Sequence, residues 1–154
     1  MAWTSPKTWN TNDLVTANDL NQQLRDNLNH LYSLNNSANA GDLNANLACY
    51  SSSPVQIGTY SVTLTTVGRP VLLIFSATAK SAAGGTVYFQ WYKSGSPSVA
   101  LGLPEYSGLS TLIPVELSIV HQVGAGTHTW FVAWNVATAT AAELYRPVLF
   151  AVEL

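Results

Sequence analysis

The stretch "GTHTWFVAWNV" at residues 126–136 decides the fold class, because its bulky residues alternate along the chain. In an extended strand, Trp130, Val132, Trp134 and Val136 share one side and Phe131 lies on the other. Alternating β-branched and aromatic residues predict a β-strand. A strand in a single sandwich usually has one wet side, whereas this one is apolar on both. We therefore expect a subunit interface behind this strand and assign Trp130 and Trp134 to it.

The same period of two recurs through residues 55–154. It is visible in "VQIGTYSVTLTTVG", "RPVLLIFSATAK", "GGTVYFQWYKSG", "STLIPVELSIVHQV" and "ELYRPVLFAVEL". Gly and Ser lie between most of these runs, and short strands separated by turn residues are typical of an all-β domain. The sequence predicts a mostly β protein whose residues 55–154 form an antiparallel jelly-roll β-sandwich. The run "PVLLIF" is apolar throughout, so a second strand is expected to be covered on both sides.

The composition indicates assembly and disfavours several classes of partner. Hydrophobic residues make up 47% of the 154 residues and charged residues only 9%, where about 25% is typical. The net charge is −2 and no basic cluster exists, which disfavours nucleic acid as a partner. No apolar run is long enough for membrane insertion. The first residues, "MAWTSPKTWN", lack the apolar core of a signal peptide, so we expect synthesis in a cytoplasm.

The chain before residue 55 has a different character, since eleven of the twelve Asn residues lie in the first 46 positions. We predict an extended N-terminal arm over residues 1–15, an amphipathic helix over 16–35 and a polar linker over 36–54. Trp3 and Trp9 flank Pro6 in the arm. These two tryptophans either pack on the rest of the chain or anchor the arm in a larger structure.

The helix is predicted to start at Thr16, with Asp19 completing a capping-box-like arrangement. Its apolar residues follow the 3-4 spacing of a heptad seam. The members of this predicted subunit interface are Leu20, Leu24, Asn27, Leu31 and Leu34. Asn27 is the polar member, which can fix register and strand number. The alternative is an amphipathic helix that lies on its own β domain; the polar linker favours self-association.

The sequence contains little that suggests catalysis. His121 and His128 flank the "QVGAG" turn, but no third ligand lies near them, so no metal site is predicted. Cys49 is the only cysteine and is expected to be a small apolar filler. The carboxylates of the β region are far apart in sequence, at Glu105, Glu116, Glu143 and Glu153. No nucleotide or nucleophile motif is present, and we predict neither a cofactor nor enzyme activity.

Exposed tyrosines could bind sugars by stacking, because Tyr has an apolar ring and a polar tip. The candidates are Tyr88, Tyr92, Tyr106 and Tyr145. The preferred alternative is that these rings line subunit interfaces or cap the core.

The N-terminal stretch "AWTSPKTWNTNDLVTANDLNQQLRDNLNHL" resembles a segment that recurs at the N-termini of structural proteins of tailed bacteriophages. The shared pattern is a Trp-Thr opening, a Pro, a second Trp and then "VTAxxLNxxLRDNLNxL". Lys7 stands where an Arg is usual. The later piece "GAGTHTWFVAW" is similar to trimeric TNF- or C1q-like sandwiches.

This resemblance implies a homotrimeric protein of the virion surface, made in the host cytoplasm. Its partners would be copies of itself and the major capsid or tail proteins, with Trp3 and Trp9 docking the N-terminal arm on the virion. The short chain favours a capsid decoration or cement protein that stabilises the head by protein–protein contacts. The alternative is a tail-fibre, minor tail or head-fibre protein whose β-sandwich binds host surface glycans.

Overall fold

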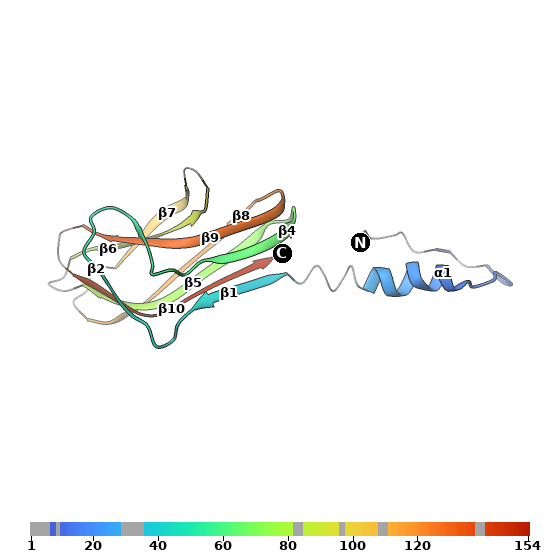
Figure 1. Ribbon diagram of the computed structural model, residues 1–154, viewed down its shortest axis with the longest axis horizontal. Coiled ribbons are helices and arrows are strands. Elements are labelled where there is room, and N and C mark those ends of the chain that lie inside the picture. The colour runs from blue at the N-terminus through green and yellow to red at the C-terminus, as the bar shows by residue number, and fades with distance from the viewer. Residues whose placement is uncertain are drawn as a thin grey trace. The chain divides into compact units, whose positions relative to one another are not determined.

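In a computed structural model, the protein is described over residues 7–8, 10–28, 36–81, 85–95, 98–107, 111–137 and 141–154, with the backbone alone for 103–107. The chain divides into two compact units, Met1–Asn36 and Ser37–Leu154. Figure 1 shows the first as a helical unit and the second as a β-sandwich. Each unit is described by itself.

The helical unit begins where the sequence predicted. Helix α1 (Ala17–Leu20) continues into a π-helical segment, η1 (Asn21–Asp26). Thr16 is the N-cap: the Asp19 N–H donates to Thr16 Oγ1 at 3.1 Å, and the Thr16 N–H donates to Asp19 Oδ2 at 3.2 Å. This reciprocal pair satisfies two donors that the helix start would otherwise leave open. The predicted capping box is confirmed, while residues 29–35 of the predicted helix lie outside the described residues.

The second unit is a sandwich of two five-stranded antiparallel sheets. The β10 sheet has the order β1-β10-β5-β8, with β2 also paired to β10; its strands are β1 (Ser37–Gly41), β2 (Asn46–Cys49), β5 (Val71–Ser81), β8 (Ile113–His121) and β10 (Ala142–Glu153). The β9 sheet has the order β3-β9-β6-β7, with β4 also paired to β9; its strands are β3 (Val55–Gln56), β4 (Val62–Val67), β6 (Val87–Lys93), β7 (Val99–Ser107) and β9 (Ala125–Val136). The predicted antiparallel sandwich is confirmed.

Alternate residues of the long strands fill the space between the sheets. The largest fully buried side chains are Trp91, Trp130, Phe75, Phe89, Ile57, Leu73, Leu144, Leu149, Val62, Val71, Val87 and Val132. Trp130 and Trp134 are 0% and 2% exposed and belong to this core. The prediction that they form a subunit interface was therefore wrong. The alternation correctly placed them on one side of β9, but that side faces the interior of their own chain.

Two indole N–H groups reach strand β8 from the opposite sheet. The Nε1–H of Trp91 donates to the Leu117 carbonyl oxygen at 3.2 Å, and the Nε1–H of Trp130 donates to His121 Nδ1 at 3.1 Å. Both indoles are fully buried, so neither N–H has water as an alternative partner. These bonds fix β8 against the β9 sheet.

The polar linker predicted over residues 36–54 is in fact partly β-structure. Strand β1 pairs with β10 from Ser37↔Val152 to Gly41↔Val148, and β2 pairs with β10 from Asn46↔Tyr145 to Cys49↔Ala142. The pattern was missed because the inward positions of these short strands hold mostly small residues, such as Ala38 and Ala40, which give a weak alternation. Pairing with the long strand β10 supplies the stability that their side chains do not. Cys49 is buried in the core, as expected for an apolar filler.

We predict that the stability of the sandwich falls at acidic pH because of His121. Nδ1 of His121 must be unprotonated to accept the Trp130 N–H. Burial, with Lys93 and His128 nearby, lowers the pKa of His121 below its ordinary value of 6.5. Because the pKa of His121 is lower in the folded state than in the unfolded state, its contribution to stability is complete above the unfolded-state pKa. That contribution is lost as the pH falls from the unfolded-state pKa through the folded-state pKa. Thermal unfolding between pH 7.5 and pH 5 should show this loss.

The control variants are His121→Gln, whose amide oxygen can accept without titrating, and His128→Gln. The first should flatten the pH dependence and the second should keep it. An unchanged profile in His121→Gln would assign the acid sensitivity to other groups.

Candidate interaction surfaces

The side of the β10 sheet that faces away from the core is apolar over one end. The register of the strands places Val152, Leu72 and Val120 in one row across this side of the sheet. The next row holds Phe150, Ile74 and Ser118. We call this surface the apolar face; its members are Leu72, Ile74, Val120, Val148, Phe150 and Val152. Each of these side chains is half-buried or exposed.

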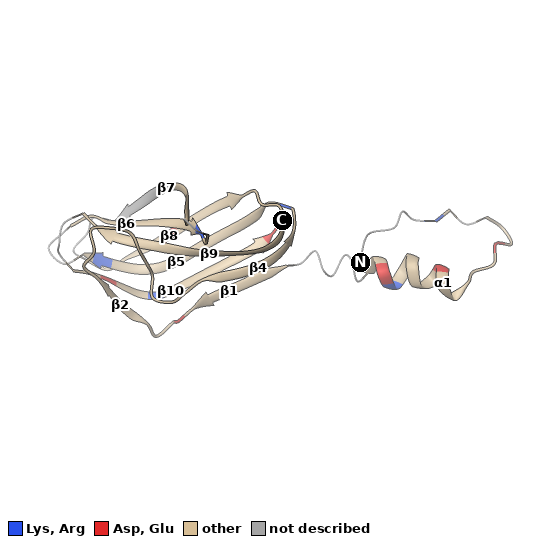
Figure 2. Ribbon diagram, turned by 45° about the horizontal axis from the view of Figure 1, so that its top comes forward, with Lys and Arg blue, Asp and Glu red and all other residues tan. Residues whose placement is uncertain are grey.

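This surface is not what a free monomer normally shows to water. Contiguous apolar patches on a monomer mark interaction sites. The run "PVLLIF" was expected to be covered on both sides, but the β unit covers only one: Leu73 and Phe75 lie in the core, while Leu72 is half-buried and Ile74 is exposed on the outward side. Figure 2 shows that Lys, Arg, Asp and Glu are sparse on the β unit. The period-two pattern of "ELYRPVLFAVEL" was a signal for the β10 members of this face, but it could not say which side was inside.

The other end of the same side carries polar groups that satisfy one another. Lys80 Nζ lies 3.1 Å from Glu143 Oε2, to which the Tyr145 hydroxyl also donates. The hydrogen bonds from Tyr145 and Lys80 lower the pKa of Glu143. The same carboxylate raises the pKa of Tyr145 and of Lys80. The group is therefore a charged, internally paired cluster at neutral pH.

The helical unit has an inverted distribution of polar and apolar residues. We call the exposed side chains of Leu20, Leu24 and Leu28 the leucine stripe, which Leu14 and Val15 extend. The shielded residues are instead polar: Asp19, Gln23, Asp26 and Asn27. The usual surface helix buries its apolar side and exposes its polar side. The leucine stripe is therefore a second candidate interaction surface.

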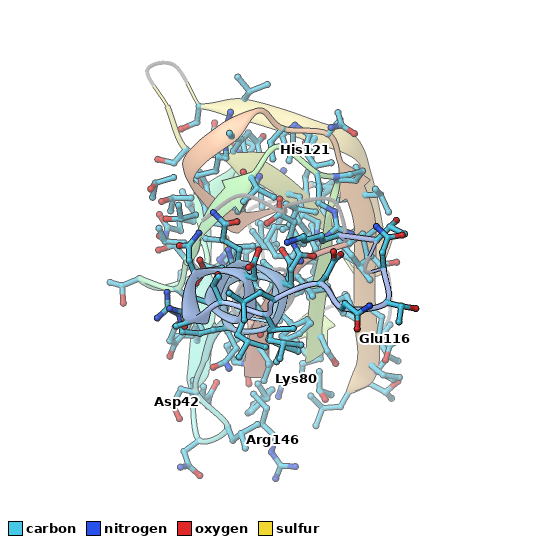
Figure 3. All side chains as sticks on the ribbon, turned by 90° about the vertical axis from the view of Figure 1, so that its right-hand side faces the viewer. Asp42, Lys80, Glu116, His121 and Arg146 are labelled. Carbon is cyan, nitrogen blue, oxygen red and sulfur yellow. The ribbon has the colours of Figure 1, made fainter. Side chains whose placement is uncertain are left out.

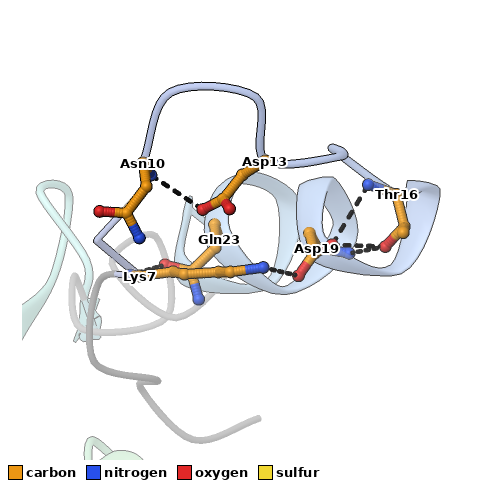
Figure 4. Close-up of polar contacts among 6 residues, drawn as sticks. All are labelled: Lys7, Asn10, Asp13, Thr16, Asp19 and Gln23. Atoms are coloured by element: carbon orange, nitrogen blue, oxygen red, sulfur yellow. Dashed lines mark hydrogen bonds and ion pairs between the residues drawn. The ribbon is translucent and has the colours of Figure 1, made fainter.

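The residues before the helix contribute to this inversion. The Lys7 N–H donates to Gln23 Oε1 at 2.8 Å, and Lys7 Nζ donates to Asp19 Oδ1 at 3.0 Å (Figure 4). Hydrogen bonds from Thr16, and then from Lys7, lower the pKa of Asp19 to about 2. The polar side of the helix is thus occupied by its own chain, and the leucine stripe remains open.

Part of the predicted seam agrees with this stripe and part does not. Leu20 and Leu24 are 46% and 56% exposed and free to meet another chain. Asn27 is only 6% exposed, so it is already covered by its own chain and the prediction that it lines a seam was wrong. A π-helical segment has more residues per turn than an α-helix, which moves the apolar side from Asn27 to Leu28. Leu31, Leu34, Trp3 and Trp9 lie outside the described residues.

A shallow hollow of about 440 Å³ lies on the outward side of the β9 sheet. It is lined by Pro54, Gln56, Tyr92, Ser98, Phe131 and Ala133. The rings of Tyr92 and Phe131 stack with centroids 5.5 Å apart and planes within 9°. Phe131 is therefore half-covered by its cross-strand neighbour, which explains the second apolar side of β9 without another subunit.

The described residues contain no group of three or more His, Cys, Asp or Glu side chains that could hold a metal ion. His121 and His128 both contact the Trp130 ring, with centroids 6.3 and 5.8 Å away. Their position is thus structural. Within the same described parts of the chain, no helix has the length and apolar character needed to cross a membrane.

Comparison with known proteins gives the fold and not a family. No family model matches the sequence, and no curated protein matches it significantly. Among solved structures, Eiger TNF from S. frugiperda has a TM-score of 0.53 at 11% identity, over 77% of this chain and 91% of the other. The globular domain of zebrafish complement 1qA has a TM-score of 0.47 at 12% identity, over 78% and 97%. Infectious bursal disease virus, Gx strain, has a TM-score of 0.43 at 12% identity, over 75% and 36%. The β unit has an antiparallel jelly-roll fold of the TNF type.

Proposed function

We propose that this protein is a homotrimeric structural protein of a bacteriophage virion, a decoration or cement protein that stabilises the head by protein–protein contacts. The observation that carries self-association is the apolar face of the β10 sheet, which the strands of the β unit leave uncovered. The virion assignment is supported by the N-terminal segment described above. The protein acts by binding and has no enzymatic role.

Two surfaces on one chain favour copies of the chain as the occupants. Once the apolar faces of neighbouring copies meet, their helical units are held at high effective concentration. The leucine stripes of those units then bind one another more readily than they bind a free partner. The choice of a trimer follows from the N-terminal resemblance. In a cyclic trimer each subunit contacts the next through two different patches, and closure of the ring prevents open-ended growth.

We predict that charges placed on either surface weaken the trimer. Burying one Leu or Ile side chain contributes about 1.5–3 kcal/mol, and each 1.4 kcal/mol corresponds to about tenfold in affinity. Ile74→Asp and Leu24→Asp should each raise the concentration at which the trimer dissociates by at least about tenfold. Light scattering on a dilution series of the full chain measures this.

Matched controls add the same charge elsewhere. Thr63→Asp lies on the outward side of β4, and Asn18→Asp lies in the first turn of the helix; both positions are exposed. These variants should dissociate like the wild type. A trimer that withstands Ile74→Asp would rule out the apolar face as the subunit contact.

The decoration role is tested on the virion itself. Antibody labelling in electron micrographs should place many copies on the head, and heads that lack the protein should release DNA at a lower temperature. Added wild-type protein should restore the release temperature, whereas Ile74→Asp should not. Label confined to the tail would contradict the decoration role while leaving a structural role in the virion.

The hollow beside Tyr92 and Phe131 favours a second candidate function, a fibre protein that binds host surface glycans. Aromatic rings next to the Gln56 amide and the Ser98 hydroxyl offer both stacking and hydrogen bonding to a sugar. Binding of the purified protein to a glycan array, lost in Tyr92→Ala and kept in Tyr50→Ala, would support it. The absence of binding across a broad array would count against this candidate.

A further inference from the structure

The outward side of the β10 sheet carries few charges, and they differ in whether they are paired. Lys80 and Glu143 satisfy each other. Among the residues that the structure describes, the side chains of Glu116 and Arg146 have neither an ion pair nor a hydrogen bond. Both side chains are exposed, and both residues are labelled in Figure 3. A negative and a positive group thus remain unpaired on the surface that we propose to be buried.

The register places Glu116 at the β8 edge of the apolar face and Arg146 on β10, just past Val148 at the end of that face. Glu116 lies on the edge strand β8, opposite Ser76 of β5, whose other neighbour is Val148 of β10. Arg146 lies in the irregularity of β10 between Tyr145 and Val148. Strand β5 therefore lies between β8, which carries Glu116, and β10, which carries Arg146.

The backbone at Arg146 also indicates a role for its side chain. Its φ of 54° lies in the left-handed region, which Gly and Asn adopt readily and a long side chain adopts at a cost. The Arg146 N–H donates to the Ala45 carbonyl oxygen at 3.2 Å, which holds this conformation. The side chain borders a hollow of about 270 Å³ with Thr78, Leu112 and Tyr145. Residues in such conformations persist where the surrounding structure holds them, and they cluster at functional sites.

An unpaired charge is costly to bury, because removal from water is not offset by a partner. A cyclic trimer brings one surface of a subunit against a different surface of the next. The β8 edge with Glu116 on one copy would then meet the outward surface of β10 with Arg146 on its neighbour. Opposite charges at such positions select the correct partner and orientation.

We propose that Glu116 of each copy forms an ion pair with Arg146 of the adjacent copy, and that this pair sets the register in which the apolar faces meet. The inference rests on the self-association proposed above and names the residues that orient it. The Lys80–Glu143 pair takes no part, since it is complete within one chain. A different role for Glu116, blocking unwanted pairing at the edge strand β8, predicts no dependence on Arg146.

The test is a charge swap in the full chain. Glu116→Arg and Arg146→Glu should each raise the dissociation concentration by at least about tenfold, and the double variant should restore it to within a few-fold of the wild type. Arg146→Asn, which suits the left-handed backbone, should keep the thermal stability of the fold and still weaken the trimer. Lys93→Glu, a reversal away from this face, should leave the trimer unchanged.

Each remaining outcome overturns a different statement. If both single reversals leave the trimer intact while Ile74→Asp dissociates it, the ion pair is wrong and the apolar face stands. If the double variant fails to restore a trimer that each single variant weakens, the two charges act independently and the pairing is wrong. If Ile74→Asp has no effect, the self-association surface itself is wrong.

Discussion

Two buried indoles fix strand β8, and the outward surface of the β10 sheet depends on where that strand lies. An unpaired buried N–H costs about 1–3 kcal/mol, so Trp91 and Trp130 each require an acceptor. Both acceptors, the Leu117 carbonyl and His121 Nδ1, belong to β8. A slip of one residue would remove both bonds and exchange the two sides of the strand. The hydrogen bonds that hold β8 against the core therefore also keep Glu116 and Val120 on the outward side of the sheet.

The core of the β unit is already filled, so the apolar residues outside it need a separate explanation. Trp and Phe side chains from both sheets already fill the interior of the sandwich. The outward residues of β5 and β10 are nevertheless apolar, although nothing in their own unit covers them. With only 9% charged residues in the chain, this surface has little protection against association. This outward apolar surface is the ground on which we propose contact between chains.

The sequence was informative about periodicity and poor at deciding which side is inside. Alternation correctly grouped Trp130 with Trp134, yet a period of two is the same for a buried and an exposed side, so their assignment to an interface failed. The strands at residues 37–41 and 46–49 were missed because their inward residues are mostly small and their stability comes from pairing with β10. Asn27 was misplaced because the heptad assumed α-helical geometry through a segment that is π-helical.

The helical unit shows why spacing alone could not define its partner surface. The leucines at positions 20, 24 and 28 are exposed, while Lys7 binds the polar residues beside them through Gln23 and Asp19. That contact joins residues 12 and 16 positions apart in the chain, beyond the reach of any helical repeat. A short helix is marginal in water on its own, so a stripe of exposed leucines on it is stable only if something covers it. Under the self-association that we propose, copies joined through their β units would meet that need, because the first contact would supply the second with its partner at high local concentration.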